Sequence, residues 1–87
     1  MRLDKFLKVA RIIKRRTIAK EIADQDRVQI NGRPAKSSTK VAIGDEIGLV
    51  FGNKTLVVRV DDLRDTTKKA ESEGMYTVLE ERFEEKE

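Results

Sequence analysis

The sequence contains no cysteine and no histidine among its 87 residues. The lack of cysteine excludes a disulfide framework, and the lack of both residues excludes thiolate and imidazole metal ligands. It also excludes nucleophilic catalysis by a Cys or His of this chain. No apolar run approaches the roughly 20 residues of a membrane span, and the N-terminus lacks the apolar core of a secretion signal. We therefore expect a soluble, cytoplasmic protein without a metal or cofactor.

The charges of this small chain are unevenly distributed. Its length suits one domain near the lower limit for a single hydrophobic core. Residues 1–40 carry twelve Lys and Arg against four Asp and Glu, whereas residues 41–87 carry seven against twelve. The net charge of +3 therefore hides a strongly basic first half. Such asymmetry is typical of a polyanion-binding half, and a helical surface that is merely rich in Lys and Arg is the alternative.

The apolar residues of the basic half follow a helical period. The first helix is predicted from a single stripe spaced i, i+3, i+4 and i+7, which comprises Leu3, Phe6, Leu7 and Ala10. We expect Asp4 in its first turn, where a carboxylate suits the helix dipole. After a connection over residues 12–16, Thr17 is a suitable N-cap for a second helix that ends near Asp24. The expected buried face of this helix consists of Ile18, Ala19, Ile22 and Ala23.

The chain then changes to the period of two that is typical of strands. Val28 and Ile30 precede Asn31-Gly32, which is a strong hairpin signal. Pro34 predicts an edge or irregular segment, followed by a polar loop over residues 36–40. Residues 47–51 and 56–60 alternate on either side of Gly52-Asn53 and predict a second hairpin. The fold class is therefore α+β, with two or three short N-terminal helices packed on a small twisted antiparallel sheet.

The basic residues cluster where a phosphate-binding surface could form. One group surrounds the first helix and the start of the second, where free helix N–H groups add partial positive charge; it comprises Arg2, Lys5, Arg11, Lys14, Arg15, Arg16 and Thr17. A second group on and after the first hairpin supplies further donors, namely Asn31, Arg33, Lys36, Ser37 and Lys40. Adjacent Arg15 and Arg16 are the hardest to explain without a ligand, because neighbouring cations repel one another. We expect Thr17 to act as a cap more than as an RNA contact, and Asn31 is required by its turn in any case.

Folded RNA is the polyanion that this pattern favours. The second helix offers Lys20, Glu21 and Asp24 outward, and two acidic residues argue against reading a DNA major groove. Phosphate and shape recognition by Arg and backbone donors suits structured RNA. Tyr76 and the phenylalanines are expected in the core, so stacking of single-stranded bases is not predicted.

Two other classes of function have weaker support. An RNA-modifying enzyme would need a general acid or base from the candidates Asp4, Asp45, Asp61 and Asp62. None of these stands in a pattern that suggests a perturbed pKa. Docking on an anionic membrane would require the apolar stripe of the first helix to be exposed, although its spacing predicts a core position.

Four blocks of the sequence, in this order, resemble the RNA-binding domain first seen in small-subunit ribosomal protein S four, also called the αL motif. The blocks are Arg2-Leu3-Asp4-Lys5-Phe6-Leu7, Lys14-Arg15-Arg16-Thr17, Val28-x-Ile-Asn31-Gly32-Arg33-x-Ala35-Lys36 and Val41-x-x-Gly44-Asp45. The resemblance implies short helices on a small antiparallel sheet, with RNA held against the helices and the first hairpin. We accordingly expect an RNA-binding domain over residues 1–65 with its motif core at 1–50. A short helix or docking segment should follow at 66–79, carrying Met75, Tyr76, Val78 and Leu79, and an acidic, disordered tail at 80–87.

As a stand-alone copy of this domain, the chain is similar to the heat-shock-protein-fifteen-kilodalton and RqcP group. That resemblance implies a monomeric factor without catalytic activity that binds obstructed large ribosomal subunits through large-subunit rRNA and peptidyl-tRNA. It would assist the alanine-tailing factor RqcH in adding C-terminal alanines to stalled chains. The glutamates that replace a long basic extension favour the short form of the group. A factor for ribosome assembly or RNA regulation is the alternative, which the sequence alone does not separate.

Overall fold

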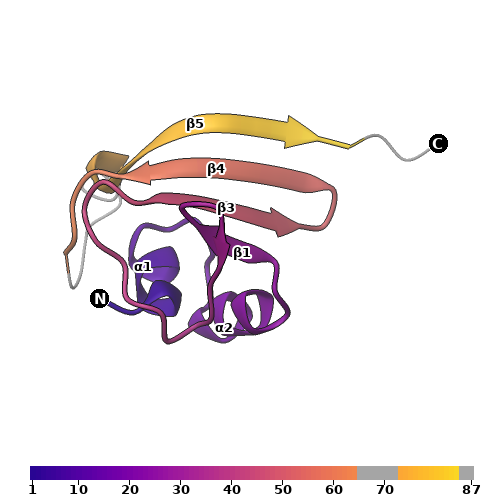
Figure 1. Cartoon of the computed structure of the whole chain (residues 1–87), viewed down its shortest axis with the longest axis horizontal. Coiled ribbons are helices and arrows are strands. Elements are labelled where there is room, and N and C mark those ends of the chain that lie inside the picture. The colour runs from indigo at the N-terminus through magenta and orange to yellow at the C-terminus, as the bar shows by residue number, and fades with distance from the viewer. Residues whose placement is uncertain (65–72, 85–87) are drawn as a thin grey trace.

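Two short helices pack on one face of a five-stranded antiparallel sheet in the computed structural model (Figure 1). The structure describes residues 1–64 and 73–84. The elements in chain order are α1 (Leu3–Val9), α2 (Arg16–Asp24), β1 (Val28–Ile30), β2 (Arg33–Pro34), β3 (Glu46–Phe51), β4 (Lys54–Val60), the 3₁₀ helix η1 (Glu73–Met75) and β5 (Tyr76–Phe83). The predicted α+β class is confirmed. Neither α-helix among the described residues has the length and apolar character to cross a membrane.

The hydrophobic core fills the space between the helices and the sheet. From α1, Leu3, Phe6 and Leu7 are fully buried and Ala10 is 1% exposed, as their helical spacing predicted. Strands β1, β3 and β4 contribute their inward residues, which are Val28, Ile30, Ile47, Leu49, Leu56, Val58 and Val60. Buried residues alternate with more exposed ones along β1, β3 and β4, so each of these strands turns one face to the helices.

The sheet has the strand order β2-β1-β3-β4-β5. The predicted first hairpin joins β1 to β2 through Asn31 (φ 53°) and Gly32 (φ 81°), and two positive φ angles define a type I′ turn. Pro34 lies on β2 at one edge of the sheet, which agrees with its missing N–H. The predicted second hairpin pairs β3 with β4 from Glu46↔Arg59 to Phe51↔Lys54.

Helix α2 differs from the prediction at its start and on its buried face. The N–H groups of Ile18 and Ala19 both donate to the carbonyl of Arg15, at 3.1 Å each, so Arg15 is the N-cap and the helix begins at Arg16. The prediction that Thr17 caps the helix is therefore wrong. Ile18 was expected in the core but is 42% exposed, because it lies just outside the stripe formed by Ala19, Ile22 and Ala23.

The C-terminal part is more ordered than the sequence indicated. The acidic tail was predicted to begin at residue 80, but β5 continues through Phe83 and pairs with β4 from Val60↔Tyr76 to Lys54↔Phe83. Backbone pairing with β4 explains this, since it requires no apolar side chain. Residues 65–72, which include the first half of the segment predicted at 66–79, lie outside the described residues.

Of the residues expected to dock after this gap, only some reach the core. Met75 is fully buried and Tyr76 packs against the core, as predicted. Val78 and Leu79 are 47% and 45% exposed, so their predicted docking is wrong. Phe83 was expected in the core with the other phenylalanines but is 63% exposed, at the far end of the edge strand β5.

Candidate nucleic-acid interface

A buried carboxylate, that of Asp4, lies between two arginines of the first predicted basic group. Asp4 is only 3% exposed, although it belongs to the first turn of α1. The Nε atom of Arg2 lies 3.2 Å from its Oδ1 atom, and the Nε atom of Arg16 lies 3.3 Å from its Oδ2 atom. The two arginine side chains remain 49% and 50% exposed. Asp4 therefore holds two half-exposed guanidinium groups that come from separate parts of the chain.

The backbone around Arg2 brings a third cation to this place. Arg2 is extended and forms an antiparallel bridge with Lys40. Hydrogen bonds on either side of the bridge, from Leu3 N to Thr39 O and from Val41 N to Met1 O, are both 2.8 Å long. The N-terminus and the loop at residues 36–40 thus run side by side. The structure thereby unites Arg2, Arg16 and Lys40, which the sequence had assigned to two separate groups; we call these three residues and Asp4 the Asp4 cluster.

The ionisation of Asp4 is fixed by its neighbours. Burial by itself raises the pKa of Asp4, but hydrogen bonds from Arg16 and from the Lys5 backbone N–H, and the charges of Arg16 and Arg2, lower it further than burial raises it. The net pKa lies below the usual 3.8. The carboxylate consequently stays charged at neutral pH and keeps both arginines bound.

The connection between the helices carries further exposed cations on an anchored backbone. Helix α1 ends at Val9, and Arg11 takes a positive φ of 61° in the turn that follows. Ile12 and Ile13 both donate their N–H to the carbonyl of Leu7 at 3.1 Å, and Ile13 is buried. The exposed cations of this segment are Arg11, Lys14 and Arg15. They lie immediately before Arg16 in the chain, so the predicted basic corner is present as a surface feature.

Residues of the second predicted group have structural partners. Ser37 is 4% exposed, and Asp24 accepts its N–H at 3.1 Å and its hydroxyl at 3.2 Å. The Nζ atom of Lys36 lies 2.6 Å from Asp26 Oδ1. These contacts attach the loop after the first hairpin to the C-terminal end of α2.

The amide of Asn31 has a structural role in its turn. It donates to Asp45 Oδ1 at 3.1 Å and accepts the Glu46 N–H at 2.9 Å. Arg33 is exposed on β2. A part for Asn31, Arg33, Lys36 and Ser37 in RNA binding stays a prediction.

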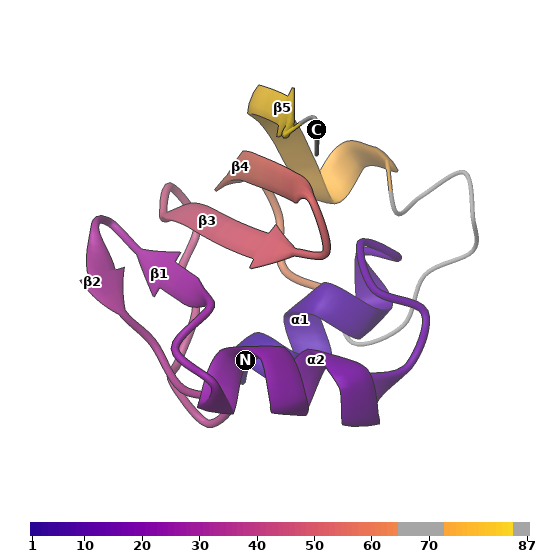
Figure 2. The ribbon, with the colours of Figure 1, turned by 90° about the vertical axis from the view of Figure 1, so that its right-hand side faces the viewer.

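The hairpin and the basic corner lie toward opposite ends of α2. Figure 2 shows β1 and β2 beside the end of α2 that leads into β1, whereas the connection from α1 joins α2 at its other end. With nine residues, α2 separates the two places by about 13 Å. Thr17 lies on its exposed side with Lys20, Glu21, Asp24 and Gln25, where they line a shallow hollow. The two acidic residues there agree with the expectation that α2 does not read a groove.

Asp4 contacts two of the predicted site residues, Arg2 and Arg16, although it was not among them itself. Its expected role was limited to the helix dipole and to a candidate acid or base. The sequence contained a signal for a contact with Arg2. Asp4 directly follows Leu3 of the apolar stripe and is two residues after Arg2, so it lies at the edge of the predicted buried face near a cation. Its partner Arg16 lies twelve positions away, and only the packing of α1 against α2 brings the two together.

Comparison with known proteins places this arrangement in a family. Residues 1–47 match the S4 domain family. Over 81 residues the chain is 60% identical to a Bacillus subtilis (strain 168) protein named RQC P-site tRNA stabilizing factor, covering 93% of this chain and 94% of that protein. A protein of the same name from Streptococcus pneumoniae is 55% identical over 81 residues, with coverages of 93% and 92%.

A solved structure has a similar fold. The Heat Shock Protein 15 of Vibrio cholerae, described as trimeric, superposes with a TM-score of 0.84 at 31% identity, covering 91% of this chain and 81% of that chain. The chain therefore belongs to the S4 domain family and, within it, to the family of the RQC P-site tRNA stabilizing factors.

Proposed function

We propose that this chain is an RNA-binding factor of ribosome-associated quality control. It binds obstructed large (50S) ribosomal subunits through rRNA and peptidyl-tRNA, and it stabilises the tRNA while RqcH adds C-terminal alanines to the stalled nascent chain. It acts in the cytoplasm as a monomer and performs no chemistry of its own. The observation that carries this proposal is the Asp4 cluster, in which both helices present half-exposed arginines at one place.

The geometry of the cluster suits phosphate groups of folded RNA. Guanidinium groups bind phosphate through paired N–H donors, and Arg2 and Arg16 converge with Lys40 at the backbone bridge. Lys14 and Arg15 extend the same positive surface from the neighbouring connection. Arg16 is the first residue of α2, Arg2 directly precedes α1, and the connection and the loop at 36–40 are anchored by hydrogen bonds, so the fold sets the backbone positions of these cations.

Three of the four acidic residues that are candidates for a catalytic acid or base have lowered pKa values. The pKa of Asp61 is lowered by hydrogen bonds from Thr77 and Arg59, and the pKa of Asp62 by hydrogen bonds from Arg64 and the Leu63 N–H. The pKa of Asp4 is lowered as well. A general acid working near neutral pH needs a raised pKa, so these groups support a binding function and not acid–base catalysis.

The experiment that tests the proposal is sucrose-gradient sedimentation of the tagged protein from cell extract, with sequencing of the RNA that co-purifies. We expect the protein with large subunits together with tRNA. Recovery with mature small subunits, with a single mRNA or as free protein would contradict the proposal. If loss of the protein gives immature subunits and leaves alanine tailing intact, an assembly or regulatory role replaces it.

A pair of matched variants identifies the RNA-binding surface in the same experiment. Lys14→Glu combined with Arg15→Glu should remove the protein from the large-subunit fraction, because both residues are exposed at the basic corner. Lys20→Glu combined with Arg27→Glu makes the same change in charge on exposed residues outside the predicted site and should leave sedimentation unchanged. Arg16→Glu is less informative, since it places a second carboxylate beside the buried Asp4.

A further inference from the structure

We infer that Asp4 is a positioning residue for RNA binding, whose buried carboxylate orients the guanidinium groups of Arg2 and Arg16 toward RNA phosphates. The inference rests on the proposed function and adds a residue that does not itself touch RNA. It assigns a binding role to a negative charge within a surface that attracts a polyanion.

The contacts of Asp4 show how this positioning is achieved. Its Oδ1 atom accepts from Arg2 Nε at 3.2 Å, from Arg16 Nη2 at 3.4 Å and from the Lys5 backbone N–H at 2.8 Å. Its Oδ2 atom accepts from Arg2 Nη2 at 3.4 Å and pairs with Arg16 Nε at 3.3 Å. Each arginine therefore faces the carboxylate with one edge of its guanidinium group. Three of the five N–H donors of each group remain on the other side, where the side chain is half exposed.

Positioning of this kind benefits binding for two reasons. A long arginine side chain loses much conformational freedom when it is fixed on a phosphate, and an arginine that is already held loses less. In addition, two guanidinium groups at one place repel each other, and the carboxylate between Arg2 and Arg16 offsets that repulsion. The Lys5 N–H bond fixes the carboxylate itself to the first turn of α1.

A positioning role for Asp4 predicts an effect opposite in sign to that of simple electrostatics. Asp4→Asn raises the net charge from +3 by one unit, so charge alone predicts tighter binding to RNA. Loss of positioning predicts weaker binding instead. We expect the affinity of Asp4→Asn for purified large ribosomal subunits to fall about tenfold at physiological salt. The plot of log affinity against log salt should also become shallower by about one unit for each phosphate that the variant no longer binds.

A thermodynamic cycle separates positioning from a merely structural role. Asp4→Asn is made in the wild-type chain and in the Arg2→Gln, Arg16→Gln double variant, with thermal unfolding as the check that each protein is folded. Positioning predicts that Asp4→Asn loses its effect when both arginines are absent. A structural role predicts the same loss in both backgrounds, which would overturn the inference. Asp61→Asn, which breaks a comparable contact with Arg59, is the matched control and should not weaken binding.

A second variant keeps the test decisive if Asp4→Asn does not fold. Arg16→Lys conserves the charge but replaces the planar guanidinium group by a single ammonium group, which cannot face Asp4 and a phosphate in the same way. It should weaken binding about tenfold, whereas Arg27→Lys, an exposed control outside the site, should bind like the wild type. Equal binding by the wild type, Arg16→Lys and Arg27→Lys would overturn the inference.

The outcomes for the inference and for the proposed function are distinct. If the wild-type protein binds large subunits and Asp4→Asn binds them equally or more tightly, the positioning role is refuted and the proposed function stands. If the wild-type protein binds neither large subunits nor unfractionated tRNA, the proposed function is refuted, and the positioning role with it.

Discussion

The substitution Met75→Ala tests how firmly the C-terminal strand is attached to the core. Met75 is the last residue of η1, immediately before β5, and its side chain is completely buried. Its carbonyl also accepts the N–H groups of Asp61 and Asp62, at 2.8 and 3.2 Å. The substitution keeps these backbone bonds and removes only the buried side chain. The change in stability therefore measures the contribution of side-chain packing at this junction.

The expected loss follows from the burial of Met75. A fully buried Met that is truncated to Ala costs about 2–5 kcal/mol, because apolar packing is removed and a cavity remains. A domain of this length has a total stability of roughly 4–13 kcal/mol. A loss of about 3 kcal/mol would lower the melting temperature by roughly 12–24 °C. The substitution should therefore be among the most damaging in the C-terminal part.

Urea unfolding followed by circular dichroism gives the comparison, with Leu79→Ala as the matched control. Leu79 lies on β5 and is 45% exposed, so its truncation should cost less than about 1 kcal/mol. Similar losses for the two variants would refute the placement of Met75 in the core and of Leu79 at the surface. Little or no loss for Met75→Ala would refute the docking of η1.

Three further predictions concern acid stability, salt and the first hairpin. The folded-state pKa of Asp4 lies below its usual value of 3.8, so ionised Asp4 contributes stability above pH 3.8, and this contribution is lost as the pH falls through the lower pKa. The urea midpoint of unfolding should therefore fall between pH 6 and 2, and it should fall less steeply for Asp4→Asn. If roughly four or five phosphate contacts form, log affinity for RNA should fall against log salt with a slope near −3 to −4 in filter-binding titrations, whereas a flat plot would contradict phosphate binding. Gly32→Ala should lower the free energy of unfolding in urea by about 1–2 kcal/mol, because Gly32 has a φ of 81°. Gly74 does not have a positive φ, so Gly74→Ala should lower it less.

The parts of the fold that were predicted correctly depend on local patterns. The stripe of Leu3, Phe6 and Leu7 and the turn at Asn31-Gly32 are each contained within a few residues. Strand β5 was missed because its apolar residues do not alternate regularly with polar ones: Val78 and Leu79 are adjacent, and the charged residues 80–82 follow them. Its position depends on backbone pairing with β4, more than fifteen residues earlier in the chain, which side-chain periodicity does not report.

The candidate site could be given from the sequence as a set of residues, whose role in RNA binding stays a prediction, but not as an arrangement. The sequence identified Arg2, Arg16 and Lys40 as cations, yet it could not show that Arg2 and Arg16 meet at one carboxylate or that Lys40 lies opposite Arg2 across a backbone bridge. The sequence also named Ser37 as a donor for RNA, and it could not show that the buried Ser37 donates to Asp24; its part in RNA binding stays a prediction. Residue type alone does not distinguish an exposed polar group from one that satisfies a neighbour.

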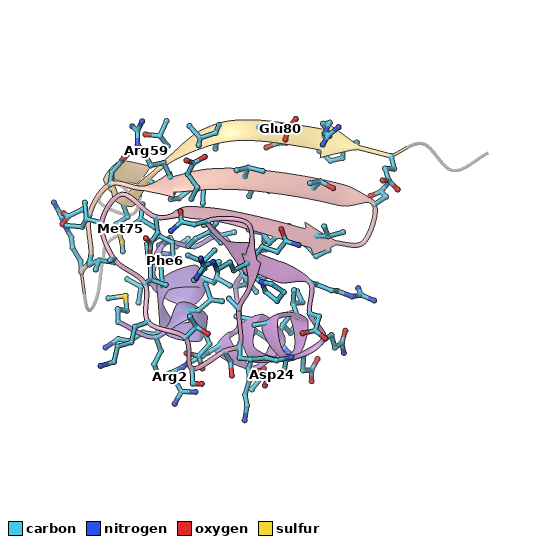
Figure 3. All side chains as sticks on the ribbon, in the orientation of Figure 1. Arg2, Phe6, Asp24, Arg59, Met75 and Glu80 are labelled. Atoms are coloured by element: carbon cyan, nitrogen blue, oxygen red, sulfur yellow. The ribbon has the colours of Figure 1, made fainter. Side chains whose placement is uncertain are left out.

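The separation of charge along the molecule limits how RNA can approach it. Arg2 lies on the helical side and Glu80 lies on β5 at the opposite side, as Figure 3 shows. The molecule measures 39 × 24 × 23 Å, whereas the Debye length at physiological salt is only about 8 Å. Glu80 and Glu81 of β5, which themselves pair with Arg82 and Lys54, therefore do not offset the positive charge of the Asp4 cluster. If RNA binds at the Asp4 cluster as proposed, it should approach from the helical side of the described residues, which would give this small domain one preferred orientation on a large polyanion.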